Sequence, residues 1–147
     1  MHLPTCLEQR PPLIIPTTDL RSLREIVTAI RPPDPQAAVA AWLEEELDRA
    51  TVVAPETLPP RVVTMHAQVS YRDDVTDQVG RVTVVYPGEE DADAHAISVL
   101  SPVGAALLGL SEGQSIRWRT VSGGFRGLTA LRVLFQPYGA TGPRDGF

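Results

Sequence analysis

Apolar side chains in the first third of the chain recur at helical spacing. A Thr-Thr-Asp run at residues 17–19 offers a side-chain cap for a helix start, and one apolar stripe follows it. The stripe consists of Leu20, Leu23, Val27 and Ile30. Pro32 and Pro33 cannot continue a helix, so the pattern predicts that this first helix ends just before them.

A second helix is expected immediately afterwards, because Asp34 and Pro35 stand in the order of a helix cap and a first-turn proline. Its apolar stripe is Val39, Trp42 or Leu43, and Leu47. Two helices with one stripe each and a link of about four residues pack as an antiparallel pair. Residues 17–50 are therefore predicted to form a short helical hairpin, a coiled coil that is roughly 18 to 22 Å long at about 1.5 Å per residue.

Prolines and a change of period divide the rest of the chain. Prolines at positions 4, 11, 12 and 16 forbid a helix there and predict an extended arm over residues 1–16. Residues 51–60 form a proline-interrupted linker, and beyond it the helical period gives way to strand alternation. We expect the main domain to cover residues 61–137 and a disordered tail to cover residues 138–147.

The main domain has the pattern of several strands around one short helix. The clearest alternation predicts a half-buried strand with Thr64 and His66 on its polar face. Its inward positions are Met65, Ala67, Val69 and Tyr71. Further β-rich segments cover residues 81–87, 97–100, 115–120 and 128–137, with an acidic loop from Glu89 to Asp93 between the first two. This predicts an α+β fold with a strongly curved antiparallel sheet and one short helix.

The run "ISVLSPVGAALLGL" from Ile97 to Leu110 is the strongest local signal. Ser101 can cap a helix, Pro102 fits its first position, and Gly109 can end it. One interpretation is a well-delimited helix that packs on the sheet. The other is that exposed amides at the start of this helix form a docking surface for a partner helix.

Charge is distributed unevenly along the chain. The net charge is −5, all thirteen basic residues are Arg, and residues 116–147 carry five of them beside one acid. The net charge argues against nonspecific duplex binding by the whole protein, so direct contact with nucleic acid is expected to be weak or absent. Candidates for a local basic patch are Arg117, Arg119, Arg126 and Arg132, for which a solvated sheet face is the alternative interpretation.

Motifs for metal or nucleotide chemistry are missing from the sequence. His95 could meet Asp91 and Asp93, but a solvated loop explains these residues better, and "SGGFRG" has neither the Lys nor the setting of a phosphate loop. The lone Cys6 excludes an internal disulfide. We expect no metal site, no cofactor and no metabolic enzyme activity. No apolar run suggests a signal peptide or membrane span, so we expect no membrane contact and a cytoplasmic protein.

Three motifs in order, "VVTM", "VYP" and "SPVGAALLGL", carry a resemblance over residues 40–137. This segment resembles the C-terminal domain of the bacterial Gre transcript-cleavage factors. It is more similar still to the Rnk-type members of that superfamily, the regulators of nucleoside diphosphate kinase. In the Rnk type a run of the form "ELDRA" leads to "VVTM", and both stand here between Glu46 and Met65.

The resemblance implies a fold, a partner and a site. It implies an FKBP-like C-terminal domain that docks on RNA polymerase, at a coiled coil on the rim of the secondary channel. The docking residues it implies are Val99, Ser101, Pro102 and Val103. In a Gre factor, acidic residues at the tip of the helical hairpin hold a magnesium ion that drives hydrolysis of the backtracked transcript.

The chain departs from the cleavage factors at its hairpin. The hairpin is much shorter than theirs, and its tip "RPPDPQ" offers only Asp34, which is adequately explained as a helix cap. We therefore predict a regulator that occupies the polymerase rim without cutting RNA. The run from Glu44 to Glu46 is expected to be a solvated face. The alternatives are direct regulation of nucleoside diphosphate kinase by protein contact and, for the implied fold, a prolyl isomerase, although the chain has few aromatic residues for an isomerase pocket.

Overall fold

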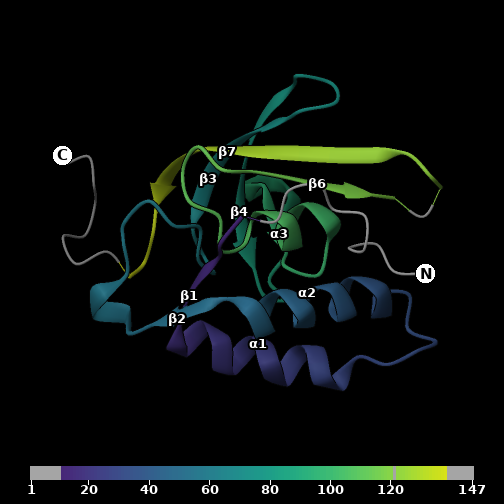
Figure 1. Cartoon of the computed structure of the whole chain (residues 1–147), viewed down its shortest axis with the longest axis horizontal. Helices are drawn as coiled ribbons and strands as arrows, with labels where there is room; N and C mark the ends of the chain where they lie inside the picture. The colour runs from purple at the N-terminus through teal and green to yellow at the C-terminus, as the bar shows by residue number, and fades with distance from the viewer. Residues whose placement is uncertain (1–10, 121, 139–147) are drawn as a thin grey trace.

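Two helices and a curled sheet enclose one hydrophobic core in the computed structural model, which describes residues 11–120 and 122–138. Strand β1 (Ile14–Pro16) leads directly into helix α1 (Thr17–Ala29), and α2 (Ala37–Arg49) returns beside α1 (Figure 1). The predicted helical hairpin is thus confirmed. It lies along the body of the molecule and covers the open side of the sheet (Figure 1).

The sheet has five strands and wraps around one short helix, α3 (Pro102–Leu107). The strands are β3 (Gln68–Asp73), β4 (Val79–Val85), β5 (Ala96–Ser98), β6 (Ser115–Arg119) and β7 (Phe125–Phe135). Their spatial order is β5-β4-β3-β7-β6, and every pairing is antiparallel except the one between β4 and β5. The predicted α+β class with a curved, mostly antiparallel sheet is confirmed. Two short 3-10 turns, η2 (Pro55–Thr57) and η3 (Ala92–Ala94), lie in the connections.

The core lies between the inner face of the sheet, α3 and the hairpin. Each element contributes the face that its apolar period predicts, because only that face can leave water without burying unpaired polar groups. The hairpin contributes Leu23, Val27, Trp42, Leu43 and Leu47, all buried. The sheet and α3 contribute, among others, Val69, Val84, Ala106, Leu107, Ile116 and Leu128.

Short parallel strands join two segments that the sequence presents as an arm and a linker. Strand β1 pairs with β2 (Thr51–Val53), and the Thr51 N–H donates to the Leu13 carbonyl at 2.8 Å. The Ile14 N–H donates to the Gly109 carbonyl at 3.2 Å, which ties this small sheet to the end of the α3 segment. Pairing between residues so far apart in the chain leaves no periodic pattern, so the sequence did not indicate it.

The first predicted strand begins later than its alternation suggests. Thr64, expected on a polar face, is fully buried, and β3 starts only at Gln68. His66 has a φ of 64°, in the left-handed region, and its N–H donates to the Val84 carbonyl at 2.6 Å. The prediction for this stretch was wrong because a turn with apolar flanks shows the same alternation as a strand.

Neither hairpin helix has the side-chain cap that the sequence predicted. Pro16 stands at the N-cap of α1, and no side chain caps that end. Helix α2 begins at Ala37, three residues after Asp34, whose carboxylate accepts from the Gln36 N–H at 2.8 Å in the preceding turn. Glu46, expected on a solvated face, is buried and pairs with Arg49 at 2.7 Å.

The ends of the chain are described in part. Tyr138, assigned to a disordered tail from sequence, packs against α1, whereas residues 139–147 lie outside the described part of the chain, as do Cys6 and His2. Within the described residues, no helix combines the length and the apolar character that a membrane crossing requires.

Candidate partner-docking site at the Ser-Pro corner

The Ser101 hydroxyl makes two hydrogen bonds across the corner between β5 and α3. The Ser101 Oγ accepts from the Gly104 N–H at 3.1 Å and donates to the Ser98 carbonyl at 2.6 Å. Pro102 occupies the first helical position, where a backbone N–H would have no partner within the helix. The predicted cap and proline are therefore confirmed as local structure. Helix α3 ends at Leu107, and Gly109 follows with a φ of +85°, beyond the helix end.

A close backbone approach at Gly104 was missed in the sequence. A Cβ atom added to Gly104 would lie 2.3 Å from the Ser98 carbonyl oxygen, closer than any side chain tolerates. The chain turns so sharply between β5 and α3 that only a glycine fits there. The signal was present as a glycine in the first turn of a capped helix, a position that helix propensity alone disfavours.

The predicted docking residues differ in exposure. Pro102 is exposed, and Ser101 and Val103 are partly exposed. Val99 is fully buried, and its N–H donates to the Val85 carbonyl at 2.8 Å. Val99 therefore positions the corner from inside the core and offers no surface to a partner.

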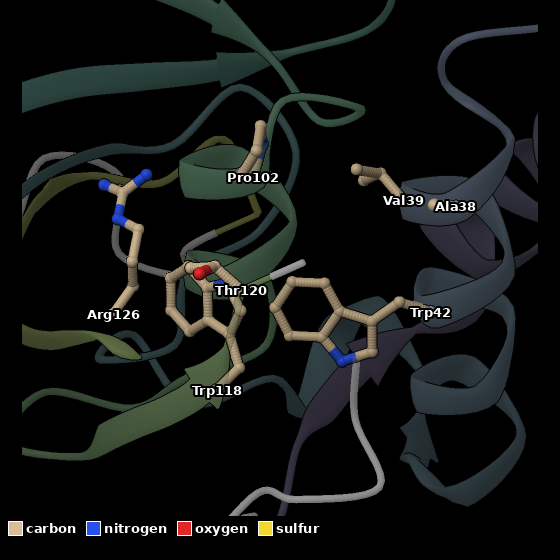
Figure 2. A pocket seen from close by; sticks show the side chains of 7 residues that line it. All are labelled: Ala38, Val39, Trp42, Pro102, Trp118, Thr120 and Arg126. Carbon is tan, nitrogen blue, oxygen red and sulfur yellow. The ribbon is translucent and has the colours of Figure 1, made fainter. Parts of the chain in front are cut away.

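Pro102 stands at the edge of an apolar pocket of about 220 Å³ (Figure 2). Helix α2 forms one wall, and β6 with the start of β7 forms the other. The lining residues are Ala38, Val39, Trp42, Pro102, Trp118, Thr120 and Arg126. The Trp42 and Trp118 rings meet at the floor, with centroids 5.3 Å apart and planes tilted by 41°. The hairpin thus supplies half of a pocket that the sequence did not predict, because Trp42 and Trp118 are far apart in the chain.

The positively charged side chain of Arg126 lies at the rim of this pocket. The Arg126 guanidinium lies over the Trp118 ring, 5.6 Å from its centroid, and 3.8 Å from an Asp73 carboxylate oxygen. The site therefore combines an apolar hollow, an exposed proline and a positive charge. Such a combination suits a partner that presents an apolar side chain next to an acidic one.

The predicted basic patch divides between the two sides of the sheet. Arg126 lies beside Trp118 at the pocket, whereas Arg117, Arg119 and Arg132 are exposed on the outward face. Arg117 and Arg119 both stack on the Phe125 ring, at 5.0 and 4.7 Å from its centroid.

A buried carboxylate fixes the hairpin to the sheet domain. Asp19, 2% exposed, accepts from the Met65 N–H at 3.0 Å and from the Tyr138 hydroxyl at 2.7 Å. The Thr18 hydroxyl in turn donates to Tyr138 at 3.0 Å. Burial raises the pKa of Asp19, against the lowering effect of these hydrogen bonds, and burial also raises the pKa of nearby Tyr86 to about 12. Sequence analysis assigned Asp19 to a local cap, but its partners lie in other elements.

The tip of the hairpin, residues 31–36, is exposed and borders a hollow beside the sheet domain. Asp34 and Gln36 border a second, more open hollow of about 380 Å³, together with Pro87 and Leu100 from the body of the domain. Glu25 on α1 adds a second carboxylate to this hollow. The predicted tip residue Asp34 is exposed, and its hydrogen bonds stay within the turn: its carboxylate accepts from the Gln36 N–H, and its backbone bonds to Arg31 and Ala37.

The acidic loop makes hydrogen bonds both within itself and to neighbouring segments. The Glu89 carboxylate accepts from the Tyr86 N–H at 3.0 Å and lies 2.9 Å from the His66 ring, which lowers the pKa of Glu89. Asp91 accepts from the Asp93 N–H at 3.0 Å. Over residues 11–120 and 122–138, no group of three His, Cys, Asp or Glu side chains is placed to hold a metal ion.

Comparisons with known proteins agree on one family. A model described as "Transcription elongation factor, GreA/GreB, C-term" matches residues 58–133, and one described as "Rnk N-terminus" matches residues 11–53. The regulator of nucleoside diphosphate kinase of Escherichia coli strain K12 is 38% identical over 131 residues, which are 89% of this chain and 95% of that protein.

Gre factors themselves are also similar to the chain. The transcription elongation factor GreA of Beijerinckia indica is 32% identical over 96 residues, 65% of this chain and 60% of that protein. Among solved structures, a prokaryotic transcription elongation factor GreA/GreB from Nitrosomonas europaea superposes with a TM-score of 0.65 at 36% identity. That superposition covers 84% of this chain and 98% of the other.

Proposed function

The chain belongs to the GreA/GreB transcription elongation factor family and carries the Rnk-type N-terminus, and from this premise we propose that it is a transcription regulator that docks on RNA polymerase without cleaving the transcript. The docking position that the family resemblance implies is the rim of the secondary channel. The observation that carries the proposal is the exposed Pro102 at the edge of the apolar pocket.

The pocket matches what a coiled coil presents to a partner. A coiled coil displays apolar side chains along a stripe, with charged side chains beside it. One apolar side chain of the rim would enter the hollow between Pro102, Val39 and the two Trp rings, which bury it on three sides (Figure 2). A neighbouring carboxylate would pair with Arg126 at the rim of the pocket, and this fixes the register of the two surfaces.

The hairpin supports a role without catalysis. Each helix has 13 residues and therefore spans about 20 Å, and the exposed tip of the hairpin borders a hollow beside Pro87 and Leu100. Metal-assisted hydrolysis needs several oxygen ligands around one ion. Asp34 and Glu25 are the two carboxylates that border the hollow at the tip, and one oxygen of Asp34 accepts from the Gln36 N–H.

The test is a pull-down of core RNA polymerase with wild type, Pro102→Asn and a control, Pro60→Asn. Pro60 is also exposed and does not line the pocket. Wild type and Pro60→Asn should retain the polymerase, and Pro102→Asn should lose most of it. On a backtracked elongation complex, none of the three should release a cleaved RNA fragment, whereas an authentic Gre factor should. Failure of folded wild type to bind, or cleavage by it, would refute the proposal.

A second candidate follows from the name of the relative. The Escherichia coli protein that matches 89% of this chain is called a regulator of nucleoside diphosphate kinase, so direct binding to that kinase is the alternative. The same three proteins discriminate the two candidates when nucleoside diphosphate kinase replaces the polymerase in the pull-down. Retention of the kinase, but not of the polymerase, would transfer the docking role to this partner.

A further inference from the structure

Arginines gather on the outward face of the sheet, on the side away from α3 and the hairpin. Strand register shows which positions share this face, because directly paired residues point to the same side. Arg81 on β4 pairs with Ser70 on β3, and Ser70 pairs with Arg132 on β7, so the three form one row across the sheet.

The neighbouring rows extend the same face to the edge of the sheet. Arg72 pairs with Thr129, and Thr129 pairs with Ser115 on β6. Two and four residues further along β6 come Arg117 and Arg119, and alternate strand positions share a side. The outward positions of β3, β4, β6 and β7, all within the described chain, thus hold five arginines. The arginines are Arg72, Arg81, Arg117, Arg119 and Arg132. One carboxylate, that of Asp74 just after β3, lies on the same face, where it bonds to Arg72 and to the Thr129 hydroxyl.

We propose that this outward sheet face binds the phosphate backbone of nucleic acid. A chain with a net charge of −5 has placed five of its basic residues together on one surface. The electrostatic field near a surface depends on the local charges, because charges beyond about 10 Å are largely screened at ordinary ionic strength. The negative total charge therefore does not prevent this face from attracting an anionic chain.

The chemistry of the face favours nucleic acid over an acidic protein. The positions between the arginines are small, namely Ser70, Ser115, Gly127 and Thr129, so the guanidinium groups project furthest from the sheet. Protein interfaces have apolar and aromatic centres, whereas phosphate contacts are made mainly by arginine, lysine and small hydroxyl residues. The large apolar residues of this face, Val79, Phe125 and Phe135, lie towards its borders.

Two of the guanidinium groups are already held in place. Arg117 and Arg119 stack on the Phe125 ring from neighbouring positions of β6, with guanidinium carbons 5.0 and 4.7 Å from the ring centre. Groups that are ordered before binding lose less entropy when they contact phosphate. Arg72 is engaged differently, because it pairs with Asp74 at 2.9 Å, so the proposal is carried by Arg81, Arg119 and Arg132.

The proposed face is separate from the Ser-Pro corner. Figure 1 shows α3 and the hairpin on one side of the sheet. The pocket lies between these elements and the sheet, whereas strand register places the arginine rows on the opposite side. Nucleic acid and a protein partner at Pro102 could therefore bind at the same time. The proposal does not depend on the identity of that partner.

The experiment measures fluorescence anisotropy of labelled 20-nucleotide RNA and of a 20-base-pair DNA duplex over a series of salt concentrations. The face variant is Arg81→Gln, Arg119→Gln and Arg132→Gln combined. The control variant combines Arg21→Gln, Arg31→Gln and Arg61→Gln, which are exposed arginines of other elements. Each variant loses three positive charges, so the two differ only in where on the protein these charges are removed.

Wild type should bind in the micromolar range at low salt, with affinity falling steeply as salt rises. The face variant should bind at least tenfold more weakly, and the slope of log K against log salt for the duplex should fall by about two to three, at about 0.9 per lost phosphate contact. The control variant should stay within about threefold of wild type. Tighter binding of RNA or of duplex would identify the natural source of the phosphates.

Three results would overturn the proposal. The first is no binding by folded wild type to either nucleic acid at low salt. The second is equal weakening by the face and control variants, which would mean that only total charge matters. The third is competition by polyglutamate as effective as that by unlabelled nucleic acid, which would assign the face to an acidic protein.

Discussion

Gly104→Ala should destabilise the protein, although alanine is the better helix former. Helix propensity predicts a gain of about 1 kcal/mol for this substitution within a helix. The structure predicts the opposite sign, because the added Cβ would lie 2.3 Å from the Ser98 carbonyl oxygen and 3.1 Å from the Ser101 Oγ. The sign of the effect therefore separates local propensity from the tertiary constraint of the Ser-Pro corner.

The magnitude follows from what must move. In protein structures a Cβ atom essentially never lies closer than 3.0 Å to a non-bonded heavy atom. The Ser98 carbonyl oxygen and the helix must therefore move apart by at least 0.7 Å, the difference between 3.0 and 2.3 Å. The Ser98 carbonyl also accepts from the Ser101 N–H at 2.9 Å and from the Ser101 hydroxyl at 2.6 Å, and the shift weakens both bonds. Strain and weakened bonds together cost about 3 kcal/mol. After subtraction of the propensity gain, the free energy of unfolding should fall by about 2 kcal/mol.

Thermal and urea unfolding followed by circular dichroism measure this effect. For a chain of this length, a loss of about 2 kcal/mol corresponds to a decrease in Tm of roughly 4 to 8 °C. The matched control is Gly124→Ala, where an added Cβ meets only the Thr120 hydroxyl at 3.7 Å. That control should stay within about 0.5 kcal/mol of wild type. An unchanged or raised Tm for Gly104→Ala would show that the corner does not require its glycine.

Two other substitutions test the hairpin and its anchor. Trp42→Ala removes a buried ring and should lower the free energy of unfolding, measured with urea, by about 3 to 5 kcal/mol. Trp42→Phe keeps an aromatic ring and should lower it much less. Equal losses in the two variants would contradict the packing described. For Asp19, burial raises the pKa above its ordinary value of 3.8, so the native state favours the neutral carboxyl. The stability of wild type relative to Asp19→Asn should therefore be greatest below about pH 4 and decrease as pH rises through the raised pKa, which unfolding at a series of pH values measures; an increase with pH would refute this sign.

Features encoded by neighbouring residues could be predicted from sequence. Pro32 and Pro33 separate the two helices, and the pair Ser101 and Pro102 marks the corner, because capping and the missing proline N–H act within one turn of chain. Strands β6 and β7 were also predicted, because one face of each strand is buried and the other is exposed to solvent. In each case the physical cause and the sequence signal lie in the same few residues.

Features that depend on distant segments could not be predicted. In the sequence Asp19 resembles a helix cap because it stands at a helix start. The groups that it actually binds, the Met65 N–H and the Tyr138 hydroxyl, are more than 40 residues away and leave no local signal. The pocket arises where Trp42 meets Trp118, and no pattern in either segment indicates the other. The arginine face likewise emerges only from strand register, because Arg81 and Arg132 come from strands on either side of β3.

The hairpin of this chain is both a structural element and a wall of the candidate site. If it detached from the sheet, Leu23, Val27, Trp42 and Leu43 would lose their burial, at a cost on the order of 6 to 12 kcal/mol as an upper estimate. This is comparable to the whole stability of a domain of this size, so the hairpin stays docked whenever the protein is folded. A protein that performs chemistry at the tip of its hairpin, at a distance from the domain that docks, must extend the hairpin away from that domain. In this chain the same residues complete the pocket at Pro102, which favours occupation of a docking site over chemistry at a distance.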